Sequence, residues 1–266
     1  MGPVRELAGL AVRTRAGNGD RVLWIHGYTL DATSWDELWL KLPAWNHVGI
    51  DLPGHGASRP FTPHDTLPEL GRAIGAAACA HGIRHLIALS VGTIVALQAA
   101  IEYPQVFSAI VLGAPALGGG PQDPGARTVY ERVVRRFQQR GSGRDLRTIW
   151  MAEDSPLFRG LEGCRQRWDR VAGIVDRHTW QELSSGGMFR FASHVQRRED
   201  LGRIRSAMLL LVGEQDMPAF RRSAEIIRRA VPSARRVYLP DTGHLCMLQT
   251  PDLAAACIER HLRAHA

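Results

Sequence analysis

The chain has 266 residues, of which 45% are hydrophobic and 22% are charged, as in an ordinary globular protein. This length is enough for one large α/β domain with an insertion, or for two small domains. No apolar run reaches the length of a membrane span and residues 1–6 lack the basic and apolar regions of a signal peptide, so we expect a cytoplasmic protein that binds no membrane. The net charge is +7, but the arginines are scattered and no groove-reading motif occurs, so we expect no nucleic-acid partner.

Strand-like and helical patterns alternate along most of the chain. Short apolar runs typical of strands lie at residues 10–15, 21–26, 47–51, 85–89, 109–113, 207–212 and 236–239. Helical patterns lie at residues 34–41, 67–81, 91–103, 220–230 and 251–264. Strands that alternate with helices predict βαβ units, and therefore an α/β fold with a mostly parallel central sheet flanked by helices.

The alternation is interrupted between residues 118 and 200. This stretch opens with the flexible sequence Gly-Gly-Gly-Pro at residues 118–121 and then carries helical patterns without clear strands. Strand-like sequence resumes at Ala207. We therefore expect a core built from residues 1–117 and 201–266, with a helical segment, residues 118–200, inserted between two strands of its sheet.

The strand-like run at residues 21–26 ends in a His-Gly pair. Gly27 would let the backbone turn so that the N–H of Tyr28 points into a cavity, and we expect His26 to brace this loop rather than to take part in chemistry. After the next run comes the glycine-rich loop at residues 51–58, in which His55 is expected to be a loop residue as well.

The run at residues 85–89 leads into a serine and then directly into a helical pattern. Small residues, Ala88 and Gly92, stand two positions before and after Ser90. This is the pattern of a strand, a sharp turn and a helix with a serine at the apex, where larger flanking side chains would collide. The turn would push the Ser90 hydroxyl out of the sheet, close to the free N–H groups of the helix N-terminus, which suits a nucleophile.

Two further candidates follow strand-like runs late in the chain. Asp216 follows the run at residues 207–212, and His244 follows the run at residues 236–239. Parallel sheets gather their active sites at the carboxyl ends of their strands, so these side chains are expected close to Ser90. The Gly-x-x-Asp spacing favours Asp216 over its neighbour Glu214 as the acid.

In this order, the His-Gly pair, the loop at residues 51–58, the serine turn, Gly-x-x-Asp and Gly-His resemble the α/β-hydrolase superfamily. The resemblance implies that Ser90 is the nucleophile, that His244 is the general base and that Asp216 orients it. It also implies an oxyanion hole formed by the backbone N–H groups of Tyr28 and Val91. The inserted segment would then be a cap over the site.

Supporting roles at the same site fall to His26, Gly27 and Gly92. The sequence departs from the family at Ala88 and Thr93, where glycine is common, although both residues are small enough for the turn. A serine at the nucleophile position disfavours the haloalkane dehalogenase and epoxide hydrolase branches, which use aspartate there. The overall size and the run at residues 213–218 are similar to those of small bacterial esterases and enol-lactonases.

No metal and no cofactor are expected. The sequence has no HExxH motif, no His/Cys cluster and no phosphate-cradling or dinucleotide-binding glycine motif. Its four cysteines lack C-x-x-C spacing and are expected to be buried free thiols, with Cys246 close to His244. The sequence leaves the oligomeric state open.

These patterns predict a serine hydrolase that cleaves a small-molecule carboxylic ester, lactone or thioester through an acyl-enzyme on Ser90. The alternatives are a biosynthetic lyase or cyclase in which His244 moves protons and Ser90 only binds, and a non-catalytic ligand-binding protein of the same fold. The inserted segment carries fifteen arginines and eleven acidic residues. An arginine buried beside the pocket would favour a substrate with a carboxylate, whereas solvent-facing arginines would leave the choice to shape and apolar contacts.

Overall fold

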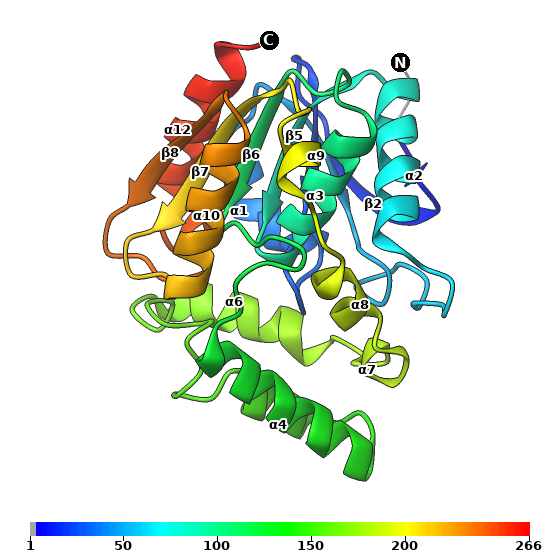
Figure 1. Cartoon of the computed structure of the whole chain (residues 1–266). Helices are drawn as coiled ribbons and strands as arrows, with labels where there is room; N and C mark the ends of the chain where they lie inside the picture. The colour runs from blue at the N-terminus through cyan, green and yellow to red at the C-terminus, as the bar shows by residue number, and fades with distance from the viewer. Residues whose placement is uncertain (1–3) are drawn as a thin grey trace.

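The computed structural model describes residues 4–266, so residues 1–3, on which the expectation of no signal peptide partly rests, lie outside it. One sheet runs through the middle of the molecule (Figure 1). Its eight strands lie in the order β1-β2-β4-β3-β5-β6-β7-β8. The β1–β2 and β2–β4 pairs are antiparallel and the other neighbours are parallel, which confirms the predicted fold class. The strands are β1 (Glu6–Leu7), β2 (Leu10–Arg15), β3 (Arg21–Ile25), β4 (Asn46–Ile50), β5 (Ile83–Leu89), β6 (Ala109–Gly113), β7 (Ala207–Gly213) and β8 (Ala234–Leu239).

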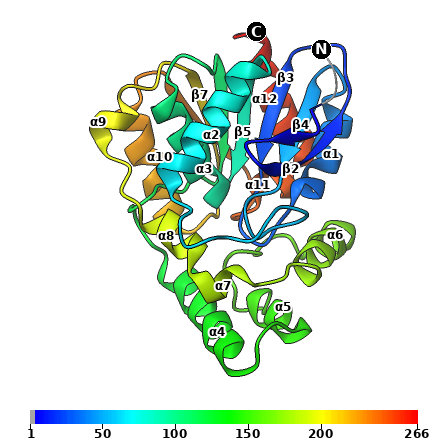
Figure 2. The same cartoon turned by 90° about the vertical axis from the view of Figure 1, so that its right-hand side faces the viewer.

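Helices cover both faces of this sheet (Figures 1 and 2). One face carries α2 (Leu67–Ala80), α3 (Val91–Glu102), α9 (Arg198–Leu201) and α10 (Pro218–Ala230), and the other carries the 3₁₀ helix η1 (Ala32–Trp35), α1 (Asp36–Lys41), α11 (Cys246–Gln249) and α12 (Pro251–Arg263). Side chains alternate between these layers, so that in β5 Leu86 packs in one apolar cluster and Ile87 in the other. The central strands are therefore buried on both faces, which explains why they are continuous apolar runs in the sequence.

The segment at residues 118–200, called the inserted segment below, lies between β6 and β7 and crosses the carboxyl ends of the strands (Figures 1 and 2). Its helices beneath the sheet are α4 (Pro124–Arg140), α5 (Arg144–Trp150), α6 (Arg165–Asp176), α7 (Glu182–Ser185) and α8 (Gly187–Ser193). The short helix α9 straddles the expected boundary at residue 200 and packs against α10 of the core. The part of the inserted segment that crosses the carboxyl ends of the strands thus ends with α8.

The expected helix at residues 34–41 is divided into η1 and α1. Asp31 caps η1, because its side chain accepts a hydrogen bond from the Thr33 N–H at 2.9 Å.

None of the helices within residues 4–266 combines the length and the apolar character that a membrane crossing needs.

Candidate active site

Ser90 stands at a strained turn between β5 and α3. Its backbone has a positive φ of 52°, with ψ −124°, a combination that is rare for residues with a side chain, and its N–H donates to the carbonyl of Gly113 at 2.9 Å. Two positions later, a Cβ atom on Gly92 would overlap the backbone carbonyls of Ile25 and His26 at the end of β3. The small residue after the serine is therefore required by the close approach of α3 to β3.

Thr93 occupies a position where the family often has glycine, and its hydroxyl joins two loops. The Oγ1 atom accepts from the Ala116 N–H at 2.8 Å and donates to the Ser90 carbonyl at 2.6 Å. Threonine at this position therefore adds a hydrogen-bonded connection between the serine turn and the loop that leads into the inserted segment.

The structure brings Ser90, His244 and Asp216 into one hydrogen-bonded line. The Ser90 Oγ atom is 2.8 Å from His244 Nε2, and His244 Nδ1 is 3.0 Å from Asp216 Oδ1. A carboxylate beside Nδ1 favours the tautomer with the proton on Nδ1, which leaves Nε2 to accept the proton of the Ser90 hydroxyl. Asp216 Oδ1 also accepts from the Met217 N–H at 2.7 Å, and both His244 and Asp216 are buried.

The loop that carries His244 is fixed by a residue that the sequence patterns did not point to. The side chain of Gln249 accepts from the Gly243 N–H at 2.7 Å and donates to the carbonyl of Arg159 at 2.8 Å. The ring of Phe220 packs on the His244 imidazole with a centroid distance of 4.2 Å. Gln249 thereby connects the His244 loop to the inserted segment.

Tyr28 and Val91 both line the cavity into which Ser90 opens. Within residues 4–266, neither of their backbone N–H groups donates a hydrogen bond to another residue, so both are free to bind a ligand oxygen. Within this loop the residue with a left-handed backbone is Thr29, with φ 61°, and a Cβ atom on Gly27 would lie 3.4 Å from the Cβ atom of Ser90. Thr29 tolerates this strain because its N–H donates to His55 Nε2 at 3.2 Å.

His26 and His55 hold the loop through matching pairs of hydrogen bonds. His26 Nε2 accepts from the Leu52 N–H at 3.0 Å, so Nδ1 carries the proton and donates to the Gly27 carbonyl at 2.8 Å. His55 Nε2 accepts from Thr29, so its Nδ1 donates to the Pro53 carbonyl at 2.9 Å. Burial lowers the pKa of both imidazoles, which keeps them neutral as these bonds require.

A cavity of about 440 Å³ opens beside Ser90 between the sheet and the inserted segment. Most of its wall is apolar, and the side chains come from both parts of the chain: Leu30, Ile94, Leu117, Trp150, Leu157, Phe158, Met188, Phe189 and Phe220. Among the described residues that line it, Arg127 is the one arginine, and it is paired with Glu131 at 2.7 Å with 65% of its side chain exposed. The cavity wall therefore offers no buried guanidinium to a carboxylate.

Cys246 lies behind His244 and is not a second nucleophile. Its side chain is buried and its Sγ atom contacts the Leu211 carbonyl at 3.6 Å. Burial raises the pKa of this thiol to about 12, so that the thiolate is scarce near neutral pH. Among residues 4–266, no group of three or more His, Cys, Asp or Glu side chains is arranged to hold a metal ion.

Comparison with known proteins places the chain in a family. The model of the alpha/beta hydrolase family matches residues 22–256. The chain is 26% identical to the pimeloyl-[acyl-carrier protein] methyl ester esterase of Serratia marcescens over 94% of its own length and 96% of that protein. It is 24% identical to the 2-succinyl-6-hydroxy-2,4-cyclohexadiene-1-carboxylate synthase of Enterobacter over 94% of its own length and 95% of that protein.

A solved structure shares the fold. A thermophilic esterase from Thermogutta terrifontis superimposes with a TM-score of 0.77 over 97% of this chain and 95% of that one, at 23% sequence identity. The family match covers the sheet from β3 to β8 and the whole inserted segment. The chain therefore belongs to the alpha/beta hydrolase family and is an enzyme of the hydrolase type.

Proposed function

We propose that this enzyme cleaves a small-molecule carboxylic ester, lactone or thioester through an acyl-enzyme on Ser90. The observation that carries the proposal is the hydrogen-bonded line from Ser90 through His244 to Asp216. The Ser90 end of this line lies in the wall of an apolar cavity. A serine hydroxyl is a weak nucleophile until an adjacent base takes its proton, and this line supplies that base and the group that orients it.

In the proposed acylation step, Ser90 Oγ attacks the carbonyl carbon while His244 Nε2 takes the hydroxyl proton. The charge that develops on the carbonyl oxygen is stabilised by the N–H groups of Tyr28 and Val91, neither of which has another acceptor among the described residues. When the tetrahedral intermediate collapses, the carbon–oxygen or carbon–sulfur bond breaks and His244 returns the proton to the leaving group. Asp216 stabilises the imidazolium in between.

Deacylation repeats the same steps with water. His244 takes a proton from the water as it attacks the acyl carbon, and then returns a proton to Ser90 Oγ as the acyl–oxygen bond breaks. The products are the free carboxylic acid and the original enzyme.

The inserted segment, in this proposal, acts as a cap that selects the substrate. Trp150, Leu157, Phe158 and Met188 of that segment supply much of the apolar wall. A substrate with an uncharged, apolar acyl group or leaving group matches this surface, because a buried carboxylate without a partner is strongly unfavourable. Arg127 is already paired with Glu131, and Asp123 also lines the cavity, so the charged side chains there do not favour an acidic substrate.

The second candidate is a biosynthetic lyase or cyclase, in which His244 moves protons and Ser90 only binds. It is favoured by the relative named as a synthase, while the relative named as a methyl ester esterase favours hydrolysis. The compound after which that synthase is named is a carboxylate, and the described lining of this cavity contains no buried arginine to bind one. The ester reading therefore fits the cavity better.

The test is labelling with a fluorophosphonate followed by localisation of the adduct by mass spectrometry. The expected result is a single adduct on Ser90, with none in a Ser90→Ala variant. Enzyme that has not been treated with the fluorophosphonate should then turn over p-nitrophenyl esters from a panel of increasing acyl-chain length. Absence of labelling in the folded wild-type protein would contradict the proposal, and labelling without turnover of any ester would favour the lyase or cyclase.

A further inference from the structure

Side chains of the inserted segment form hydrogen bonds and an ion pair with the loop at residues 28–31, which carries the Tyr28 N–H. Three side chains of the inserted segment, Glu182, Trp150 and Arg177, bond to three of its residues. The second half of the proposed oxyanion hole is therefore held both by His26 and His55 of the core and by side chains more than a hundred residues away in sequence.

Glu182 of α7 holds the side chain of Tyr28. The phenol of Tyr28 donates to Glu182 Oε1 at 2.7 Å, and His178 Nε2 lies 3.1 Å from the same oxygen. Burial and the nearby carboxylate raise the pKa of Tyr28 well above its ordinary value, so the phenol keeps the proton that it donates. Glu182 is buried and its Oε2 atom has no hydrogen-bond partner among the described residues. An apolar side chain would avoid that desolvation, so packing alone does not explain a carboxylate here.

Trp150 of α5 holds the next residue. Its indole N–H donates to Thr29 Oγ1 at 2.9 Å, and the Thr29 hydroxyl donates in turn to the Tyr28 carbonyl at 2.7 Å. This chain of bonds fixes the peptide plane that follows Tyr28. It does so next to the left-handed backbone of Thr29, where the loop is strained.

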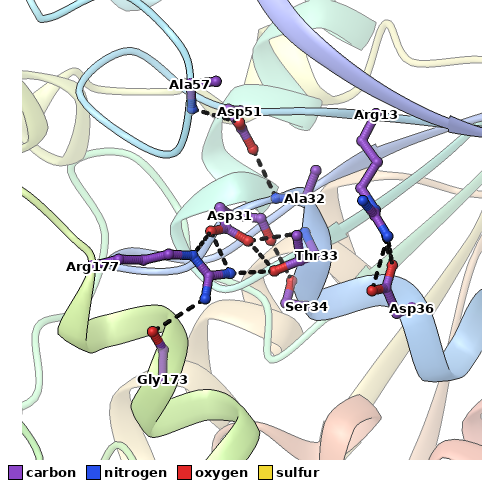
Figure 3. Close-up of polar contacts among 10 residues, drawn as sticks. All are labelled: Arg13, Asp31, Ala32, Thr33, Ser34, Asp36, Asp51, Ala57, Gly173 and Arg177. Atoms are coloured by element: carbon purple, nitrogen blue, oxygen red, sulfur yellow. Dashed lines mark hydrogen bonds and ion pairs between the residues drawn. The ribbon is translucent and has the colours of Figure 1, made fainter.

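Arg177, just after α6, holds the far end of the loop (Figure 3). Its guanidinium pairs with Asp31 at 2.8 Å and also reaches the Thr33 hydroxyl and the Gly173 carbonyl. On the sheet side, Asp51 accepts from the Ala32 N–H at 2.8 Å, so the end of the loop is fixed from both parts of the chain (Figure 3).

We infer that Glu182 is a positioning residue that helps to set the direction of the Tyr28 N–H by holding the Tyr28 phenol. It acts together with His26, which donates to the Gly27 carbonyl of the same peptide group. The inference rests on the proposed function, in which that N–H binds the developing oxyanion. Donors of this kind must lie within about 0.5 Å of the productive geometry, so a loosened loop lowers the rate even when the donor is still present. The inserted segment thus contributes directly to the geometry of the proposed oxyanion hole.

The test compares Tyr28→Phe, Glu182→Leu and the double variant, with Glu182→Gln as the conservative replacement. Asp169→Asn is the matched control, because Asp169 is an exposed carboxylate of α6 whose ion pair lies within its own helix. The measurements are kcat and KM for a p-nitrophenyl ester and the inhibition constant of a trifluoromethyl ketone, which forms a tetrahedral adduct with a serine. Circular dichroism establishes which variants are folded.

Tyr28→Phe and Glu182→Leu should each lower kcat on the order of tenfold, which is less than the loss of a whole donor, and leave KM within about twofold. Ketone affinity should fall by the same factor as kcat/KM, and the double variant should resemble either single one, because both remove the same bond. Glu182→Gln keeps an acceptor for the phenol and should lose less than about threefold.

If the folded variants keep the wild-type kcat and ketone affinity, Glu182 is only a packing residue and the inference is wrong. If Glu182→Leu does not fold, Tyr28→Phe and Glu182→Gln decide the same question. Failure of the proposed function would be seen instead in the wild-type protein, as no ester turnover and no ketone binding, and the inference would fall with it.

Discussion

A Cβ atom on Gly213 would overlap the carbonyl oxygen of Gly243, so the backbones of these two residues are in direct contact. Gly213 ends β7 and precedes Asp216, while Gly243 precedes His244. The same two loops are joined by a hydrogen bond from the Gln215 N–H to the Thr242 carbonyl at 2.8 Å. The distance between the Asp216 carboxylate and the His244 imidazole is therefore set by backbone contacts.

Replacing Gly213 by alanine should separate these loops. We expect Gly213→Ala to lower the free energy of unfolding by about 1–3 kcal/mol, as overpacking in a tight interior does, and to lower kcat by tenfold or more. Urea unfolding and ester kinetics measure the two effects.

Gly173→Ala is the matched control for that substitution. Gly173 lies in α6, and a Cβ atom there would meet no other atom within 4 Å. Alanine should raise the free energy of unfolding by about 0.5–1 kcal/mol through its helix propensity and leave kcat unchanged. Equal effects of the two substitutions on stability and kcat would show that the Gly213–Gly243 contact does not govern the site.

We expect the apolar wall of the cavity, and not the exposed Arg127–Glu131 pair at its rim, to discriminate between neutral and acidic substrates. Two esters that differ only in a terminal methyl or carboxylate group should differ by at least about tenfold in kcat/KM, in favour of the neutral one. Arg127→Gln should change this ratio by less than about threefold, because Arg127 is exposed and already paired with Glu131. Arg165→Gln, an exposed residue of α6, is the control.

A different result would reassign the specificity. If Arg127→Gln raised KM for the acidic ester several-fold and spared the neutral ester, the rim would be a carboxylate site. Small and similar effects of both arginine variants would support selection by shape and apolar contacts.

Stability should fall as the pH is lowered from about 6.5 toward 5. Burial lowers the pKa of His47 from its ordinary value of 6.5 to about 4, and burial also lowers the pKa of His26 and His55. In this window the unfolded chain takes up protons on these residues and the folded chain does not, so the free energy of unfolding rises with pH. The stability from these groups is fully present above pH 6.5 and is lost as the pH falls toward the folded-state values.

Urea unfolding at several pH values measures this slope. His47→Gln should make the slope shallower, because one of the groups that titrates only in the unfolded chain is removed. A free energy of unfolding that is constant between pH 6.5 and 5 would contradict the neutral, buried state of these imidazoles.

The sheet could be predicted from the sequence because its central strands are buried on both faces. Such strands are continuous apolar runs, as at residues 207–212, and they remain visible without knowledge of their neighbours. The two-residue strand β1 and the four-residue helix α9 could not be predicted, since elements this short have no periodicity.

The candidate site was only partly accessible to the same reasoning. Glycines at positions 92, 213 and 243 leave a local pattern, because close backbone approaches exclude a Cβ atom there. The bond between Tyr28 and Glu182 joins residues 154 positions apart, and nothing near Glu182 in the sequence marks it. Gln249 and His55 were missed as supporting residues for the same reason, since their partners are defined only by the folded loops.

The most direct test of the account is the activity of Ser90→Ala, His244→Ala and the double variant toward one ester. The three side chains of the hydrogen-bonded line should act as a unit, so each single substitution should lower kcat by about 10⁴-fold or more and the double variant should be little worse. Circular dichroism should show that the fold is kept. If Ser90→Ala retained most of the wild-type kcat, Ser90 would not be the nucleophile, and proton transfer by His244 without an acyl-enzyme would replace the mechanism proposed for this site.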